Sequence, residues 1–86
     1  MKTLSSEDDL YDYCEKRGIP VPPHFVDSYY SAIVKIRKGR ITYSLYKMIE
    51  EDMTSYNCSE DDAMEYIDFN VFGTLPNMGK KRPIIK

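Results

Sequence analysis

The chain has 86 residues, with 14 acidic and 12 basic side chains and a net charge of −2. We expect a single domain spanning residues 1–86, with an interior too small to hold a spacious enzyme cleft. The two cysteines are too few for a disulfide framework, and no secretory leader or long apolar run is recognised, so we expect a protein of a reducing cytoplasm that has no membrane partner.

Residues 5–17 are predicted to form the first helix. Ser5 or Ser6 can cap its start, the acidic residues that follow complement the positive end of a helix, and Gly18 can end it. The three prolines in residues 20–23 then favour an extended crossing, because proline fixes its own φ and restricts the residue before it.

Residues 29–44 alternate between apolar and polar side chains around a break at Lys38 and Gly39, a pattern that predicts an antiparallel β-hairpin. Gly39 supplies the positive φ that a tight hairpin turn needs. A helix through residues 30–38 is the rival interpretation, because this stretch also contains apolar pairs four residues apart.

Two helices are predicted next, over residues 43–56 and 59–70. The first has a continuous apolar stripe, formed by Leu45, Met48, Ile49, Met53 and Tyr56. Asn57 can end it in a left-handed turn, and Ser59 can cap the second helix. The inner face of the second helix is predicted to consist of Ala63, Met64, Ile67 and Val71.

The remaining residues, 71–86, form a C-terminal tail punctuated by glycine and proline, in which Gly79 is predicted to have positive φ. Residues 83–85 are predicted to add a short strand to the hairpin edge. The elements together predict an α+β fold, in which a small antiparallel hairpin packs against two or three helices and the C-terminal strand can extend the sheet to three strands.

The order of these elements and several motifs resemble a family of small uncharacterised proteins of phages, prophages and some prokaryotic genomes. The motifs are R-x-x-Y-[SD] with K-M-I, E-[YF]-I-[DE]-[YF]-N, and L-P-x-x-G-x-x-x-P-I-I. The matching residues, within about residues 27–85, are Arg40, Tyr43, Ser44, Lys47, Met48, Ile49, Asp62, Ala63, Glu65, Tyr66, Ile67, Asp68, Phe69, Asn70, Leu75, Pro76, Gly79, Pro83, Ile84 and Ile85. Val71, Gly73 and Lys80 stand where the family often has a threonine, a basic residue and an acidic residue. The resemblance implies a phage-like setting and no particular mechanism.

No catalytic, cofactor or metal site is predicted. Asp61, Glu65 and Asp68 share one helical face, which we interpret as a solvated acidic surface because no calcium-loop spacing is present. His24 has no second histidine or cysteine at metal-ligand spacing. No nucleophile motif or glycine-rich phosphate loop is found, so we predict a protein that is not an enzyme.

The function favoured by the sequence is a protein-interaction module, an accessory protein of phage type that inhibits or modulates a host protein, or binds a phage protein. The candidate binding residues lie in the tail, where apolar side chains alternate with glycine and proline and a basic run follows: Phe72, Leu75, Met78, Lys80, Lys81 and Arg82. A homodimer formed through the hairpin edge belongs to the same class.

Nucleic-acid binding is the alternative. No acid lies between Ser28 and Ile49 and none follows Asp68, so the hairpin and the tail form one basic face if the fold brings them together. The hairpin candidates are Lys35, Arg37, Lys38 and Arg40. Tyr29, Tyr30, Tyr43 and Tyr46 flank the hairpin and are candidates for stacking on bases, although Tyr13, Tyr43, Tyr56 and Tyr66 also fit core-facing stripes. A small-ligand-binding "sponge" protein is the second alternative.

Overall fold

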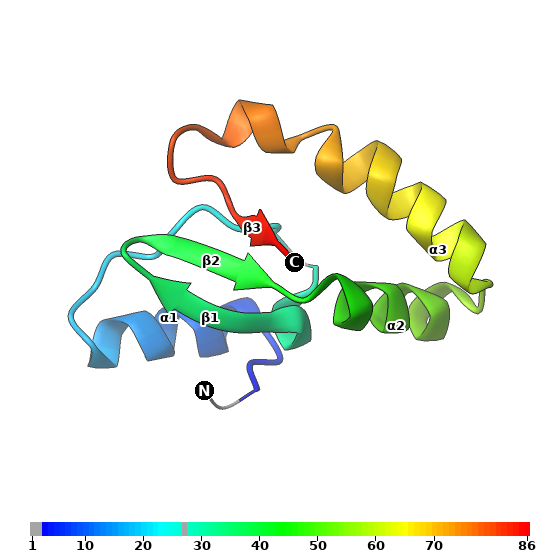
Figure 1. The fold of residues 1–86 in the computed structure, drawn as a ribbon. Coiled ribbons are helices and arrows are strands. Elements are labelled where there is room, and N and C mark those ends of the chain that lie inside the picture. Colours follow the sequence, from blue (N-terminus) through cyan, green and yellow to red (C-terminus); the bar gives the residue numbers. More distant parts are fainter. Residues whose placement is uncertain (1–2, 27) are drawn as a thin grey trace.

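The computed structural model describes residues 3–26 and 28–86, and within them it has three α-helices and one three-stranded sheet. The helices are α1 (Glu7–Lys16), α2 (Leu45–Tyr56) and α3 (Glu60–Ile67), and the strands are β1 (Ile33–Arg37), β2 (Arg40–Tyr43) and β3 (Ile84–Ile85). Short helical segments add the 3-10 turns η1 (Tyr30–Ala32) and η3 (Leu75–Met78) and the π-helical turn η2 (Asp68–Phe72). Figure 1 shows these elements, which confirm the predicted α+β class.

Strands β1 and β2 form the predicted antiparallel hairpin, and the rival helix is wrong. Lys38 and Gly39 both have positive φ, 53° and 76°, as the tight turn between two twisted strands requires. The strand pairing is shorter than residues 29–44, because Tyr29 adopts a left-handed conformation with φ of 65° and leads into η1. A bulge between Ile33 and Lys35 shifts the register before the ladder continues to the turn.

Strand β3 pairs with the opposite edge of β2, and the pairing is parallel, so the sheet is mixed rather than wholly antiparallel. The chain between β2 and β3 contains α2, α3 and the tail, and a connection of that length allows a parallel return. The amide of Lys86 donates to the carbonyl of Tyr43 at 3.0 Å, and the amide of Leu45 donates to the carbonyl of Lys86 at 2.8 Å. The last residues are therefore fixed beside the start of α2.

The predicted helix caps are present. The hydroxyls of Ser6 and Ser59 accept from backbone amides at the starts of α1 and α3, and Asn57 ends α2 with φ of 50°. Ser44 caps the start of α2 in the same way, a role that the sequence pattern did not assign to it. Helix α2 begins at Leu45 rather than at Tyr43, because Tyr43 is the last residue of β2 and its side chain is fully buried.

The predicted helix over residues 59–70 is regular only as far as Ile67, where it continues into the π-helical turn η2. A Cβ atom at Gly73 would lie 2.5 Å from the carbonyl oxygen of Phe69, closer than any real Cβ contact. Glycine at position 73 therefore allows the chain to continue past the π-helical turn η2 along its observed path.

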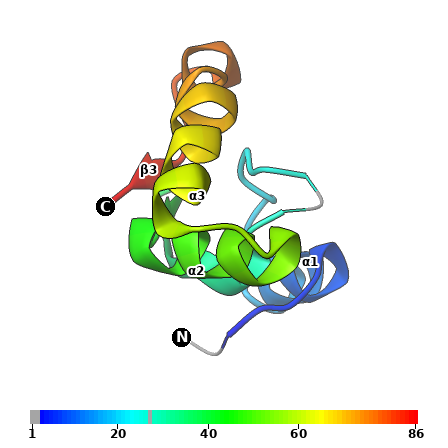
Figure 2. The same ribbon diagram turned by 90° about the vertical axis from the view of Figure 1, so that its right-hand side faces the viewer.

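The core lies between the hairpin and the helices. Figures 1 and 2 show α1 on one side of the molecule and the chain from α3 onward on the other, with α2 projecting beyond the sheet. The fully buried side chains from these elements include Leu10, Cys14, Ile41, Tyr43, Met48 and Ile67. In the described part of the chain, no helix has the length and apolar character needed to cross a membrane.

The stripe predicted for α2 faces the core only in its first half. Met48 is fully buried and Leu45 and Ile49 are half-buried, but Met53 and Tyr56 are exposed, because α2 extends past the sheet that covers its start. On α3 the predicted inner face is confirmed: Ala63, Ile67 and Val71 are buried and Met64 is half-buried.

Candidate functional site

The structure brings the two basic segments together at one end of the molecule. The ammonium of Lys81 in the tail donates to the carbonyl of Lys38 in the hairpin turn at 2.9 Å. The Nε atom of Arg40 donates to the carbonyl of Arg82 at 3.0 Å. The hairpin and tail therefore form one basic face, as the charge distribution predicts.

On this face the charged side chains are available to solvent. Lys35, Arg37 and Lys38 are exposed, as are Lys80, Lys81 and Arg82, and Arg40 is half-buried. Strand β3 occupies one edge of the hairpin, so the unpaired hairpin edge is β1, whose bulge and charged side chains are features that discourage pairing with another strand. This lowers the expectation of a homodimer formed through the hairpin edge.

The tyrosines next to the hairpin are mostly unavailable for stacking on bases. Tyr29, Tyr30 and Tyr43 are buried, whereas Tyr46 on α2 is 72% exposed. Base stacking requires an accessible ring face. The three buried rings therefore belong to the core, and Tyr46 is the one ring of this group that is accessible for stacking.

The apolar tail residues proposed from sequence are only partly accessible. Phe72, Leu75 and Met78 are half-buried, and Phe72 packs against the core. Gly79 has the expected positive φ, 85°, and directs the chain from η3 toward β3. The large exposed side chain of this region is instead Phe69, which is 83% exposed on η2.

Phe69 belongs to a group of exposed rings on the α2–α3 hairpin that we call the aromatic patch, defined as Tyr56, Tyr66 and Phe69. The predicted core positions of Tyr56 and Tyr66 are wrong, because these side chains are 61% and 44% exposed. Their ring centroids lie 5.6 Å apart at 46°. The neighbouring Tyr66 side chain raises the pKa of Tyr56.

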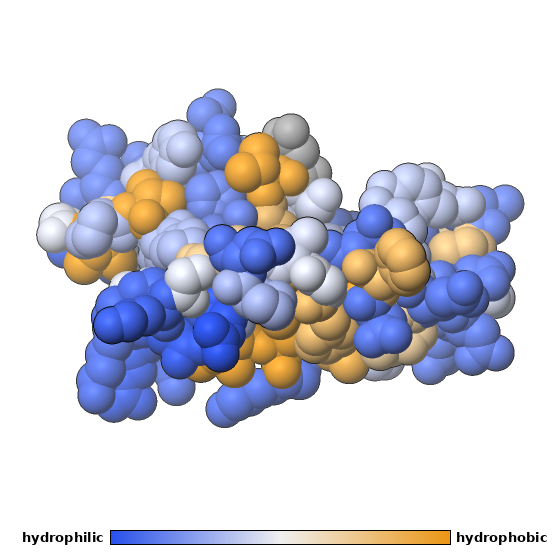
Figure 3. All heavy atoms as spheres, turned by 90° about the horizontal axis from the view of Figure 1, so that it is seen from above, coloured by the Kyte–Doolittle hydropathy of each residue, from blue (hydrophilic) through white to orange (hydrophobic). Residues whose placement is uncertain are grey.

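Acidic side chains border the aromatic patch. Asp62 and Glu65 line a shallow depression of about 370 Å³ together with Tyr66 and Phe69. Helix α3 carries further acids, and the sequence from residue 59 to residue 79 contains no lysine or arginine. In Figure 3 hydrophilic residues predominate at the end of the molecule where α2 meets α3. The patch thus combines exposed aromatic area with negative charge.

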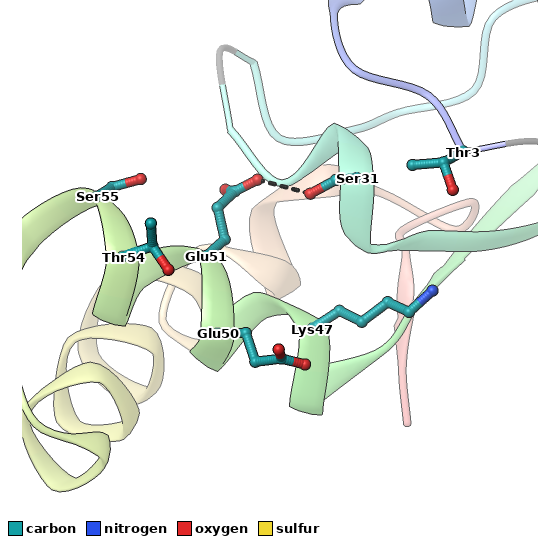
Figure 4. A pocket seen from close by; sticks show the side chains of 7 residues that line it. All are labelled: Thr3, Ser31, Lys47, Glu50, Glu51, Thr54 and Ser55. Carbon is teal, nitrogen blue, oxygen red and sulfur yellow. Dashed lines mark hydrogen bonds between the residues drawn. The ribbon is translucent and has the colours of Figure 1, made fainter.

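A third polar cluster joins α2 to the segment that precedes β1. The Glu51 carboxylate accepts from the amide of Tyr29 at 2.9 Å. It also accepts from the hydroxyl of Ser31 at 3.0 Å, as Figure 4 shows. Asp52, which is only 3% exposed, accepts from the hydroxyl of Tyr29 at 2.8 Å. The two carboxylates hold Tyr29 by its backbone and by its side chain, in a left-handed conformation that is uncommon for an aromatic residue.

The pKa values of this cluster follow from its burial. Removal from water raises the pKa of Asp52, against the hydrogen bond from Tyr29, which lowers it, while the charge of Glu51 raises it further. Burial, together with the hydrogen bond to Asp52, raises the pKa of Tyr29. Figure 4 also shows Lys47 extending away from Glu50 and Glu51, so the lysine does not neutralise them. The cluster acts as a structural clamp.

His24 has contacts typical of a structural histidine. Its Nδ1 atom lies 2.9 Å from the carbonyl of Pro22 and its Nε2 atom lies 3.5 Å from the Glu7 carboxylate. The rings of Tyr11 and Tyr30 flank it. Among residues 3–26 and 28–86, no group of three histidine, cysteine or acidic side chains is arranged to hold a metal ion.

Two features were not predicted from the sequence, the aromatic patch and the cluster in which Glu51 and Asp52 hold Tyr29. The sequence nevertheless contains a pattern that indicates each of them. Phe69 falls near the side of the helix opposite Ala63 and Ile67, and Tyr66, three residues before it, lies next to it at the flank of the buried face. Asp52 lies four residues after Met48, so it shares the buried face of α2, where a carboxylate must find a donor.

Comparison with models of protein families, with curated proteins and with solved structures finds no match to this chain.

Proposed function

We propose that this protein is a non-enzymatic interaction module, which binds a basic surface of another protein through the aromatic patch on α2, α3 and η2. The observation that carries this proposal is the exposure of the patch, where Phe69 is 83%, Tyr56 61% and Tyr66 44% accessible to solvent. Aromatic side chains are the usual anchors of protein interfaces, because they bury a large area at a small cost in side-chain entropy.

The chemistry of the partner follows from the charges around the patch. Asp62 and Glu65 border the rings, so a partner that presents lysine or arginine next to an apolar surface is complementary to both features. The Tyr56 and Tyr66 rings are already paired, which reduces the ordering needed on binding. Under the resemblance to phage and prophage proteins, such a partner is a host or phage protein whose activity the module inhibits or modulates.

Two observations support a function without catalysis. The most versatile acid-base side chain, His24, is engaged with Pro22 and Glu7. Cys14 is buried and its pKa is raised by burial, which opposes formation of a reactive thiolate.

The test is quantitative co-purification from a nuclease-treated cell lysate, followed by binding measurements with the purified partner. Phe69→Ala and Tyr66→Ala should each weaken binding by about tenfold or more, the range for interface anchors, while the melting temperature stays near that of the wild type. Tyr46→Ala is the matched control, because Tyr46 is an exposed tyrosine of α2 outside the patch.

Equal binding by the wild type and both patch variants would contradict the proposal. A partner that is lost when Lys81 or Arg82 is neutralised, but not when Phe69 is truncated, would move the protein-binding site to the basic tail. Phe72→Ala distinguishes the tail from the patch, since Phe72 packs against the core and its truncation should lower stability.

A further inference from the structure

The basic face contains a cleft that lies at the opposite end of the protein from the aromatic patch. It has a volume of about 680 Å³ and lies between the C-terminal end of α1, the residues that follow α1, and the β1–β2 turn. Its charged lining consists of Arg17, Arg37, Lys38 and Lys81. Arg17 directly follows α1, outside both segments that the sequence marks as basic, and only the tertiary fold adds it to the face.

Contacts within the chain hold two of these cations, Lys81 and Arg17, in position. Lys81 is fixed by donating to the Lys38 carbonyl at 2.9 Å. The Arg17 guanidinium lies 3.6 Å from the centroid of the Tyr13 ring, and its Nη1 atom donates to the Tyr13 carbonyl at 3.3 Å. A ligand that binds here meets charges whose side-chain freedom is already reduced, which lowers the entropic cost of binding.

The positive charges of the cleft are not neutralised within the described chain. The lining includes no aspartate or glutamate, and among residues 3–26 and 28–86 no carboxylate forms an ion pair with Arg17, Arg37, Lys38 or Lys81. The carbonyl of Cys14, at the end of α1, already accepts from the amides of Arg17 and Ile19. The charged side chains that line the cleft are therefore all positive, which suits a compact anion.

The rest of the lining is apolar. This part of the wall is formed by Ile19, Pro20 and Ile36. The Tyr13 ring, which the Arg17 guanidinium contacts, also lines the cleft. A cleft that combines a cluster of cations with an apolar wall fits a ligand that has a phosphate group at one end and a flat, weakly polar ring at the other. Arginine is well matched to phosphate, since its planar guanidinium forms paired hydrogen bonds with two oxygens.

We propose that this cleft binds a nucleoside phosphate, with the phosphates among Arg17, Arg37, Lys38 and Lys81 and the base against Ile19, Pro20 and Ile36. A mononucleotide is favoured over a nucleic-acid strand because the cations line one cavity. Of the four tyrosines next to the hairpin, three are buried and the exposed one, Tyr46, does not line this cavity. This site is separate from the aromatic patch, so the inference goes beyond the protein-binding function.

The test is calorimetric titration of the purified full-length chain with adenosine triphosphate, adenosine and inorganic tripolyphosphate at low salt. The triphosphate should bind, tripolyphosphate should bind more weakly, and adenosine should not bind detectably. Arg17→Gln and Lys81→Gln should each reduce affinity by about tenfold, the loss expected for one charge-assisted contact. Lys80→Gln should change it by less than about twofold, because Lys80 is an exposed neighbour that does not line the cleft.

A second measurement tests where the triphosphate binds. In amide nuclear magnetic resonance spectra, the triphosphate should shift the signals of Gly39 and Ile19 and leave those of α3 in place. No binding at low salt, an equal loss in Lys80→Gln, or shifts confined to other elements would overturn the proposal. So would binding of a short oligothymidylate through the same arginine and lysine without binding of the mononucleotide, since that result assigns the face to a nucleic-acid strand.

Discussion

At the scale of single residues, the least expected feature is Tyr29, a bulky side chain in the left-handed region with φ of 65°. Such a conformation costs free energy, and here the Glu51 carboxylate binds the backbone amide while Asp52 binds the hydroxyl. Adjacent acids on α2 therefore fix the point at which the chain enters η1 and β1.

Tyr29→Phe removes the hydroxyl that donates to Asp52 and leaves a buried carboxylate without this donor. We expect the free energy of unfolding to fall by about 1 to 3 kcal/mol, the penalty for an unsatisfied buried polar group. Urea unfolding at neutral pH measures the loss. Tyr46→Phe, at an exposed position, should change stability by less than about 0.5 kcal/mol, and equal effects of the two variants would show that the Tyr29 hydroxyl contributes nothing.

The burial of Asp52 also predicts how the stability of the fold depends on pH. Burial, as the largest cause, places the pKa of Asp52 in the folded protein above its ordinary value, so the folded state binds this proton more tightly than the unfolded state does. The contribution of Asp52 to stability is therefore greatest below its ordinary pKa and declines as pH rises through the raised value.

Asp52→Asn cannot titrate and keeps an oxygen that accepts from the Tyr29 hydroxyl. The stability of Asp52→Asn relative to the wild type should rise as pH increases from the ordinary pKa of an aspartate through the raised one. Urea unfolding of both proteins at a series of pH values measures this difference. Parallel stability curves across that window would show that Asp52 is not shifted by burial.

At the scale of elements, the tail is shaped by the backbone conformation of Gly79. Its φ of 85° and ψ of −166° lie in a region that only glycine occupies readily, and no atom lies within 4 Å of the position a Cβ would take. Glycine is therefore required at position 79 because of its backbone conformation, and not because a Cβ atom would collide with another part of the chain.

Gly79→Ala should accordingly destabilise the protein by about 1 to 3 kcal/mol through backbone strain at the start of the return toward β3. Thermal melts followed by circular dichroism measure the change. Lys80→Ala, at the exposed position that follows, should stay within about 0.5 kcal/mol of the wild type. A Gly79→Ala protein as stable as the control would mean that the tail can take a different path.

At the scale of the whole molecule, the N-terminal segment is part of the single core. Leu10 and Cys14 are fully buried and Leu4 is nearly so, although this segment lies outside the resemblance to the phage family. Because a domain of this size has a stability of only a few kcal/mol, deletion of residues 1–18 should abolish cooperative unfolding. A truncated protein with an unchanged thermal transition would show that residues 19–86 fold alone.

The separation of the aromatic patch from the basic cleft gives a second prediction at this scale. The molecule extends over 39 Å, and the two surfaces lie on different elements. Mutations at distant sites without shared contacts add independently. Phe69→Ala should therefore leave triphosphate affinity within about twofold of the wild type, and Lys81→Gln should leave binding of the protein partner unchanged. A cross-effect in either titration would show that the two surfaces are coupled.

The sequence by itself determined the local elements of this protein. Serine and glycine signals located the helix caps and the hairpin turn, because capping and positive φ depend on residues close together in the chain. The inner face of α3 was also predictable, since helical periodicity assigned Ala63 and Ile67 to the same side.

Only the tertiary structure decided what each face meets. It paired β3 parallel to β2, left Tyr56 and Tyr66 exposed where α2 runs beyond the sheet, and buried Asp52 against Tyr29. It also brought Arg17 to the basic face beside Lys81. Periodicity shows that a helix has two faces, but burial depends on the elements that fold back over each face, and these come from distant parts of the chain.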